Sequence, residues 1–311
     1  MTTSSGNRTR RPRRWRTLTL LVTAPMLAGS VGAGCSTSTS TSTKQASKRT
    51  TAVNVLYAGS LVGAIANQIG PAFHAATGDS LDGVAGGSTA LAAQIRGETR
   101  QGDVFVSAAP AVNQTLQGSA AGNWVSWYAT FATSKLVLGY NPKSRFAQEL
   151  RTTPWDQVVS QPGFLLGRTD PAADPKGVLA VQALTQAAAE HSQPGLAALT
   201  TSTAEVYPEE TLVGRLQAGQ IDAGFFYAVE AKAASIPTVP LTGTSLAAIY
   251  TITVLNRAPH PGGADAFVSF LFAAKGRASL VRAGLVPIDP PTVVGDRGSV
   301  PASLRMAILP G

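Results

Sequence analysis

Two serines follow glycine-rich turns at the ends of predicted strands, an arrangement suited to binding an anion. Residues 57–61 (YAGSL) follow an apolar strand-like run and open a helical pattern, and residues 86–91 (GGSTAL) do the same. A helix start offers unpaired N–H groups and the positive end of its dipole, glycines let the backbone approach a ligand, and a serine hydroxyl adds a donor. The candidate anion-binding residues are therefore Gly59, Ser60, Gly87 and Ser88. The alternative is that both serines are plain helix N-caps.

Other chemistries find less support in the sequence. His74, His191 and His260 show no metal-ligand spacing, and one cysteine cannot complete a metal site. Gly-x-Ser-x-Gly, Walker and Rossmann patterns are missing from the sequence. A serine hydrolase that uses Ser60 or Ser88 with His74 is the weaker alternative. We expect a binding protein and not an enzyme, with no cofactor and no bound metal cation.

Strands and helices that alternate along the chain would position these turns. The first set has strands at 53–57, 80–85 and 103–108 and helices at 60–77, from 88 and from 110. This βαβαβα order predicts a parallel sheet with both faces covered. A second set has strands at 164–167 and 223–227 and helices at 177–189 and 209–218. Two further helices are expected at 263–274 and 276–283, and the tail after Pro287 is expected to wrap the surface.

Extended segments at 124–140 and 249–255 connect the two sets. The predicted fold is therefore α/β and periplasmic-binding-protein-like: two α/β lobes joined by two crossing strands, with a ligand cleft between them. We assign residues 52–135 plus 246–311 to lobe 1 and residues 136–245 to lobe 2. Ligands of open α/β sheets bind at the carboxyl ends of the strands, where both serine turns lie.

The first 35 residues have the three parts of a secretory signal peptide: an arginine-rich segment, an apolar stretch at 18–30 and small residues before Cys35. Cys35 is the only cysteine and stands where bacterial lipoprotein signals place the acylated residue, although Gly32 occupies a position that is usually apolar. An ordinary cleaved signal with an incidental cysteine is the alternative. Arg13-Arg14 leaves both Sec and twin-arginine export open. Residues 36–51 predict a Ser/Thr-rich tether, which would hold the protein by lipid at the outer face of the cell membrane.

The basic charge of the chain belongs to this targeting region. Of 25 basic residues, 9 lie in 1–49, where no acidic residue occurs, leaving 16 basic and 17 acidic residues in 50–311. The folded part is therefore close to neutral, and no nucleic-acid partner is expected.

Several motifs, taken in order, resemble the molybdate/tungstate-binding solute-binding proteins of ABC importers. They are residues 58–61 (AGSL), 87–88 (GS), 102–108 (GDVFVSA), 170–177 (DPAADPKG) and 218–227 (AGQIDAGFFY), and the resemblance covers about 57–290. It implies two lobes that close around one oxyanion, a monomer, and delivery to an ABC permease in the membrane.

The resemblance also assigns roles in the site. Ser60 and Ser88 would donate from the first lobe and the Tyr227 phenol from the second. Backbone N–H groups near Lys176 and Glu209 would complete the shell. Neutral donors of this kind hold a dianion without a buried cation. Molybdate and tungstate are not distinguished, and sulfate, phosphate or a small carboxylate remain alternative ligands for the same fold.

Three charged residues have two readings each. One branch of that family adds two carboxylates to its ligand shell, and Asp174 matches the aspartate, whereas Phe226 stands where we expect the glutamate. A six-coordinate ligand is therefore left open, and helix N-capping is the favoured role of Asp174. Glu209 is first of all an acid favoured in the first turn of a helix. Lys176 either attracts the anion at the mouth of the cleft or is a solvated surface lysine.

Overall fold

The computed structural model describes residues 51–191 and 194–309. The predicted signal peptide, Cys35 and the tether up to residue 50 lie outside the described residues, so these features stay predictions. In the part that is described, no helix is both long enough and apolar enough to span a membrane.

The first lobe is built on a three-stranded parallel core, as the alternating pattern predicted. β1 (Ala52–Ala58) pairs in parallel with β2 (Ser80–Gly86) and with β3 (Val104–Ser107), and β3 pairs antiparallel with β9 (Ala247–Val254). β1 lies between β2 and β3, and its Val53 and Val55 are buried, as expected of a strand inside a parallel sheet. The helices of this lobe are α1 (Val62–Ala64), α2 (Gly70–Thr77), α3 (Ser88–Arg96), α4 (Pro110–Gln114), α10 (Pro261–Phe272) and α11 (Ala274–Ala283).

A continuous helical path from residue 59 to residue 77 replaces the single α-helix predicted there. It begins with a 3₁₀ turn, η1 (Gly59–Leu61), and a π-helical segment, η2 (Ile65–Ile69), separates α1 from α2. The predicted apolar face is confirmed, since Leu61, Ile69 and Phe73 are all buried. The 3₁₀ turn matters for the site because it carries Ser60.

The second lobe repeats the α/β plan with a smaller sheet. β7 (Ala223–Tyr227) pairs in parallel with β5 (Leu166–Thr169), and β5 pairs in parallel with β6 (Val206–Tyr207). β8 (Thr238–Pro240) pairs with β4, which is described next. The helices of this lobe are α5 (Trp155–Val159), α6 (Pro175–His191), α7 (Pro194–Thr201), α8 (Glu209–Gln217) and α9 (Ala228–Ala233).

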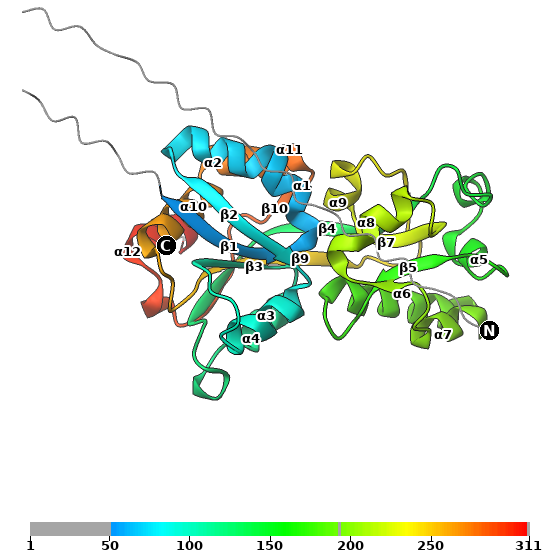
Figure 1. Ribbon diagram of the computed structural model, residues 1–311, viewed down its shortest axis with the longest axis horizontal. Coiled ribbons are helices and arrows are strands. Elements are labelled where there is room, and N and C mark those ends of the chain that lie inside the picture. Colours follow the sequence, from blue (N-terminus) through cyan, green and yellow to red (C-terminus); the bar gives the residue numbers. More distant parts are fainter. Residues whose placement is uncertain (1–50, 192–193, 310–311) are drawn as a thin grey trace, which may run out of the picture. The chain divides into compact units, whose positions relative to one another are not determined.

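One long strand, β4 (Trp127–Tyr140), joins the two lobes. Its first part pairs with β9 in the first lobe, and its last part pairs with β7 and β8 in the second. The strand order is therefore β2-β1-β3-β9-β4-β7-β5-β6 (Figure 1). The architecture of two α/β lobes agrees with the fold predicted from the sequence, while the residue boundaries assigned to each lobe stay a prediction.

The C-terminal segment differs from the surface wrap that was expected. β10 (Val286–Pro287) and β11 (Val293–Gly295) both pair antiparallel with β4, and α12 (Ala302–Ile308) buries Leu304 and Ile308 in the core of the first lobe. The apolar residues of this proline-rich tail provide the reason, because a sheet edge and a helix bury them better than an exposed coil.

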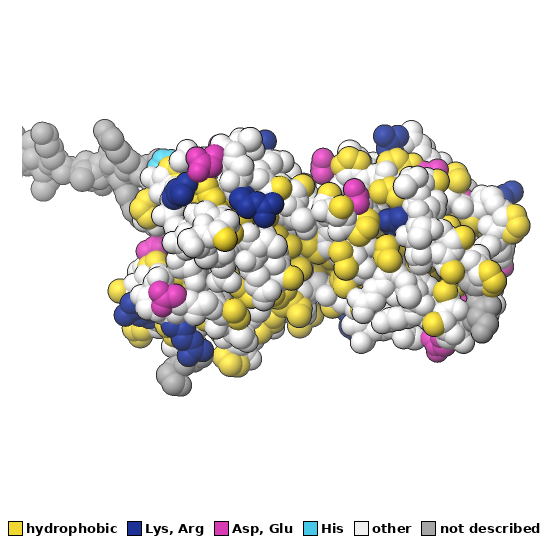
Figure 2. Space-filling model, turned by 90° about the horizontal axis from the view of Figure 1, so that it is seen from below, with side chains coloured by type: hydrophobic (Ala, Val, Ile, Leu, Met, Phe, Trp, Pro, Cys, Tyr) yellow, Lys and Arg dark blue, Asp and Glu magenta, His cyan; other side chains and the backbone are white. Residues whose placement is uncertain are grey.

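Charged side chains of both signs are scattered over the face shown in Figure 2, whereas hydrophobic side chains gather where the two lobes meet. This surface lacks the dense basic area that a polyanion-binding face requires, in line with the near-neutral charge of residues 50–311.

Candidate functional site

The two predicted serines are buried and bonded within the first lobe. Ser60 Oγ lies 2.9 Å from the hydroxyl of Tyr250, and Ser88 Oγ accepts a hydrogen bond of 3.1 Å from the backbone N–H of Ala108. Neither side chain caps its helix, because the N-cap positions of η1 and α3 are Ala58 and Gly87. The alternative that both serines are N-caps is therefore wrong.

Gly59 and Gly87, the glycines before these serines, are two of the points where the first lobe touches the second. A Cβ atom at Gly59 would lie 1.5 Å from Glu209 Oε2, and one at Gly87 would lie 2.5 Å from the carbonyl oxygen of Ala173. The backbone N–H of Ala90 also donates to this carbonyl, at 3.0 Å. Side chains at either glycine would force the lobes apart, so both glycines permit the close approach of the two lobes, whereas the sequence analysis expected them to permit the approach of a ligand.

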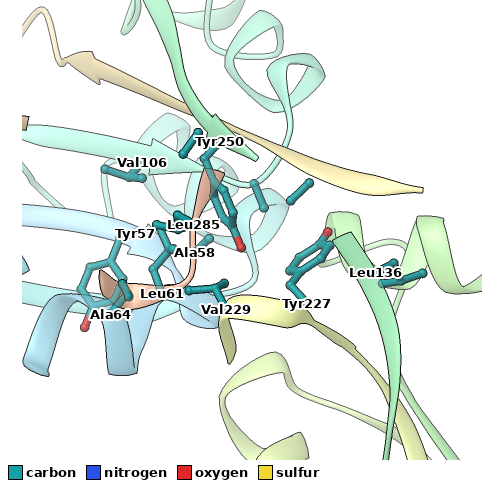
Figure 3. Packing of buried hydrophobic residues seen from close by; sticks show 14 of the residues in the cluster. Tyr57, Ala58, Leu61, Ala64, Val106, Leu136, Tyr227, Val229, Tyr250 and Leu285 are labelled. Atoms are coloured by element: carbon teal, nitrogen blue, oxygen red, sulfur yellow. The ribbon is translucent and has the colours of Figure 1, made fainter. Parts of the chain in front are cut away.

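Two tyrosines meet at the junction of the lobes. Tyr227 ends β7, Tyr250 lies on β9, and their ring centroids are 6.0 Å apart with the planes at 73° (Figure 3). Burial raises the pKa of both phenols well above the ordinary value, so both are protonated donors at neutral pH. Among the residues that the structure describes, none is hydrogen-bonded to the buried Tyr227 hydroxyl, and a buried polar group without a partner needs an explanation.

Tyr250 was not predicted from the sequence. It lies in the middle of an apolar strand, where an aromatic residue is ordinarily part of the core, and only the fold brings its hydroxyl to Ser60. No local pattern in the sequence distinguishes it.

Lys176 is completely buried, with 0% of its side chain exposed, so the reading as a solvated surface lysine is wrong. Its Nζ donates to both carboxylate oxygens of Glu230, at 2.8 and 3.0 Å, and to Glu209 Oε1 at 3.3 Å. Burial alone would lower the pKa of Lys176, but Glu230, Glu209 and Asp174 outweigh this effect and raise it above the ordinary value. The ammonium group is therefore a permanent buried cation, held inside the protein and not at the mouth of a cleft.

Asp174 caps α6, as favoured from the sequence. Its Oδ1 accepts from the backbone N–H of Lys176 at 2.9 Å and from the hydroxyl of Thr169 at 3.0 Å. Burial raises the pKa of Asp174, while Lys176, Thr169 and the backbone N–H groups of Lys176 and Ser88 act in the opposite direction. The bond from Ser88 ties the first lobe to the start of α6.

Glu209 and Glu230 complete a buried ionic group with Lys176. Glu209 is the first residue of α8, as predicted, and its side chain is buried, whereas the sequence analysis expected the backbone N–H near Glu209, and not its carboxyl group, to face the ligand. Burial raises the pKa of Glu209 well above the ordinary value, and it raises the pKa of Glu230 as well, against the attraction of Lys176. The surroundings thus include a buried cation that the sequence analysis did not expect, while the neutral donor shell around the ligand stays a prediction.

Glu230 lies three residues after Tyr227, and its Oε2 accepts from the Tyr227 backbone N–H at 3.4 Å. An acid three residues into a helix that follows a strand is a capping signal that the sequence does contain. That signal would have located α9, though not the ion pair with Lys176.

Two cavities flank these residues. One of about 480 Å³ is lined by residues that include Gly87, Asp174 and Glu209. The other, of about 290 Å³, is lined by residues that include Gly59, Ser60 and Glu209. Glu209 borders both cavities, so its side chain stands between them.

The arrangement does not favour the hydrolase alternative. Ser60 is hydrogen-bonded to Tyr250 and not to a histidine, and His74 is exposed with its ring nitrogen 3.1 Å from the carbonyl oxygen of Asp79. Within 51–191 and 194–309, no group of three His, Cys, Asp or Glu side chains is placed to hold a metal ion.

Comparison of the sequence with known proteins gives one family and several relatives. The family described as bacterial extracellular solute-binding protein matches residues 53–286. A putative ABC transporter molybdenum-binding protein of Haloferax volcanii is 32% identical over 200 residues, which cover 64% of this chain and 62% of that protein. The molybdate/tungstate-binding protein WtpA of Thermococcus kodakarensis is 23% identical, with 90% of this chain and 94% of the relative covered.

Solved structures show the same fold. The periplasmic molybdate-binding protein of Azotobacter vinelandii superimposes with a TM-score of 0.61 at 20% identity, covering 75% of this chain and 98% of that chain. The sulfate-binding protein SubI of Mycobacterium tuberculosis H37Rv has a TM-score of 0.60 at 18% identity, covering 77% and 88%. At these identities the likeness concerns the fold alone.

Proposed function

This chain belongs to the bacterial extracellular solute-binding protein family, and from that premise we propose that it binds molybdate or tungstate between its two lobes and delivers the oxyanion to an ABC permease. No bond is made or broken in this process. Binding and closure of the lobes, followed by release at the permease, make up the whole cycle.

The observation that carries the proposal is the meeting of anion-binding groups from both lobes at one buried place. Ser88 at the start of α3 and Asp174 at the start of α6 are joined through the backbone N–H of Ser88. The first residue of α8, Glu209, lies against Gly59. Each helix start contributes a partial positive charge of up to about half a unit, while the N–H groups of Ser88 and Lys176 are bonded to Asp174.

The unpartnered hydroxyl of Tyr227 is the second support. A buried hydroxyl without an acceptor costs about 1–3 kcal/mol, and an oxygen of a bound anion would remove this cost. The names of the relatives from Haloferax volcanii and Thermococcus kodakarensis point to the same class of ligand.

The proposal includes attachment at the outer face of the cell membrane. The leader-like residues 1–35 and Cys35 support it through their sequence alone. Mass spectrometry of protein from a bacterial membrane fraction would test this point, since a diacylglyceryl group on Cys35 is expected, and an unmodified cysteine in the mature protein would reject the anchor.

Titration calorimetry of the body from residue 52 onward with molybdate, tungstate, sulfate and phosphate tests the ligand. We expect sub-micromolar binding of molybdate and tungstate. Tighter binding of sulfate or phosphate would reassign the ligand within the same fold, and no binding of any of the four would reject an inorganic oxyanion as the ligand.

A further inference from the structure

Tyr250 is a buried residue at the junction of the lobes to which the proposed function assigns no role. It lies on β9, which pairs with the strand β4 that joins the two lobes. Its ring meets the ring of Tyr227 from the second lobe, with the centroids 6.0 Å apart (Figure 3). Its hydroxyl lies 2.9 Å from Ser60 Oγ of the first lobe. Tyr250 therefore contacts one candidate ligand-binding residue from each lobe.

The bond between Tyr250 and Ser60 joins two hydroxyl groups, each of which carries a single proton. The distance between the oxygen atoms allows either group to be the donor. The bond uses one of the two protons, so only one of the two hydroxyl groups keeps its proton for a further acceptor. The direction of this hydrogen bond thus decides which hydroxyl is available to a ligand.

The surroundings of the two hydroxyl groups decide that direction. Ser60 is among the residues that line the cavity of about 290 Å³, which has walls from both lobes. Tyr250 is enclosed, with 0% of the residue exposed and its ring packed between those of Phe131 and Tyr227. A proton that points into the packed interior does not meet an incoming anion, whereas the proton of Ser60 faces a space that an anion can enter. The geometry therefore favours Tyr250 as the donor and Ser60 as the acceptor.

Donation by Tyr250 prepares the Ser60 hydroxyl for an anion in two ways. A serine hydroxyl rotates to suit its partners, and a hydrogen bond accepted by Oγ restricts this rotation. In a buried site, hydrogen bonds that follow one another polarise each other, so Ser60 becomes a stronger donor. Burial raises the pKa of Tyr250 well above the ordinary value, so the phenol keeps the proton that it donates at neutral pH.

Resting on the proposed function, we propose that Tyr250 is a positioning residue for the oxyanion, which donates its hydroxyl proton to Ser60 Oγ and thereby directs the proton of Ser60 to an anion oxygen. No proton is transferred in this arrangement. Tyr250 does not touch the anion, and the effect of its hydroxyl on affinity passes through Ser60 alone.

A purely structural role of Tyr250 makes a different prediction. A buried tyrosine hydroxyl needs a hydrogen-bond partner whatever its function, and Ser60 would then be only that partner. Loss of the hydroxyl would in that case disturb the packing of the junction and lower affinity by the same factor whether or not residue 60 is a serine. The two roles therefore differ in the coupling between Tyr250 and Ser60, which a double-mutant cycle measures.

The experiment is calorimetric titration with tungstate of the wild type, Tyr250→Phe, Ser60→Ala and the variant with both changes. Tyr250→Phe keeps the ring and removes one hydroxyl, and we expect its affinity to fall about threefold to tenfold. In the Ser60→Ala background the same change should alter affinity by less than about twofold, because the group through which Tyr250 acts is already missing.

Two controls separate this effect from a general disturbance. In a Ser88→Ala background, Tyr250→Phe should lower affinity by the same factor as in the wild type, since Ser88 bonds the backbone of Ala108. Tyr128→Phe also removes a buried hydroxyl, which is bonded to Gln114 Nε2 at 3.4 Å within the first lobe. This change should leave affinity within about twofold of the wild type.

Unchanged or higher affinity in a folded Tyr250→Phe variant would overturn the inference. Equal losses in the wild-type and Ser60→Ala backgrounds would overturn it too, because Tyr250 would then act through packing. If Tyr250→Phe does not fold, Tyr250→3-fluorotyrosine decides. Its more acidic phenol is a stronger donor, so affinity above that of the wild type is expected, and affinity at or below it would overturn the assigned direction of the bond.

Failure of the proposed function gives a different result from failure of this inference. A wild type that binds none of molybdate, tungstate, sulfate and phosphate rejects the proposed function, and the role of Tyr250 falls with it. A wild type that binds sulfate in place of tungstate is carried through the same cycle with sulfate. Overturning the role of Tyr250 alone requires a wild type that binds its anion and a cycle that shows no coupling to Ser60.

Discussion

Replacement of Lys176 by Met tests the buried ionic group most directly. The change removes one cation from contact with Glu230, at 2.8 Å, and Glu209, at 3.3 Å, while it keeps much of the side-chain volume. At an effective dielectric constant of about 20, these contacts correspond to gross attractions of about 6 and about 5 kcal/mol, much of which offsets the desolvation of the ions. What remains after the substitution is a pair of buried carboxylates without a counter-ion, and we expect a loss of about 3–5 kcal/mol in the free energy of unfolding at neutral pH.

Urea unfolding followed by circular dichroism measures this loss. Lys232→Met is the matched control, because Lys232 is exposed and bonds only the backbone carbonyl of Arg282, and it should change stability by less than about 0.5 kcal/mol. Adding Glu230→Gln to Lys176→Met should restore part of the loss, since it removes one of the stranded charges. A loss below about 1 kcal/mol for Lys176→Met would refute the reasoning. Additive effects would refute it too, that is, if Glu230→Gln lowers the stability of Lys176→Met by as much as it lowers the stability of the wild type.

The same variant has a pH signature with a definite sign. Burial raises the pKa of Glu209 and Glu230 in the folded state, and loss of Lys176 raises it further. A folded state that holds more protons than the unfolded chain loses stability as pH rises. The deficit of Lys176→Met relative to the wild type should therefore shrink toward about pH 5 and grow toward about pH 8. A deficit that is constant between these values would show that the loss comes from packing and not from charge.

Three further substitutions address the ligand shell. Ser60→Ala combined with Ser88→Ala should weaken tungstate binding by roughly 2–5 kcal/mol in calorimetry, and unchanged affinity would remove both hydroxyl groups from the site. Tyr227→Phe removes a hydroxyl that no described residue partners, so thermal unfolding should show equal or higher stability. Its binding free energy for tungstate should weaken by about 1 kcal/mol or more. Lower stability together with unchanged affinity would contradict this. Gly59→Ala would place a methyl group 1.5 Å from Glu209 Oε2. The affinity for tungstate should therefore fall at least about tenfold, in a variant whose unfolding curve is like that of the wild type. An affinity equal to that of the wild type would show that this contact is not part of the bound state.

Much of the fold could be predicted because its determinants are local. The apolar runs at β1 and β7 and the helical pattern after Ser60 fall within a residue or two of their observed limits. The short helices α5, α7 and α9 were not predicted, since five to eight residues carry too little periodicity to be separated from loops. The ends of β4 and β9 were approximate for the same reason.

The sequence allowed prediction of those candidate site residues that lie in turns between a strand and a helix. Gly59, Ser60, Gly87 and Ser88 are recognisable because strand, glycine and serine adjoin in the sequence. Charged and aromatic partners from distant segments are not recognisable in this way. Lys176 and Glu230 are 54 residues apart, and Ser60 and Tyr250 are 190 apart, so their contacts exist only in the folded chain. The sequence analysis left Lys176 either at the mouth of the cleft or on the solvated surface, and it did not expect full burial because lysines are almost never fully buried unless they are paired.

The location of these groups explains how a ligand would favour the closed arrangement. Lys176, Glu209 and Glu230 all belong to helices of the second lobe, so their ion pairs do not depend on contact with the first lobe. The contact of Glu209 with Gly59 does depend on it. In this arrangement of the lobes two polar atoms are buried that nothing in the described chain partners, the Tyr227 hydroxyl and Glu209 Oε2, at a cost of about 1–3 kcal/mol each. An anion oxygen that accepts a hydrogen bond from the Tyr227 hydroxyl would remove the cost of that atom where the two lobes are together, and a ligand shifts a conformational equilibrium by its difference in affinity for the two states. The ion pairs of Lys176 thus stay within the second lobe, and the Tyr227 hydroxyl is the group through which binding of an anion would favour closure.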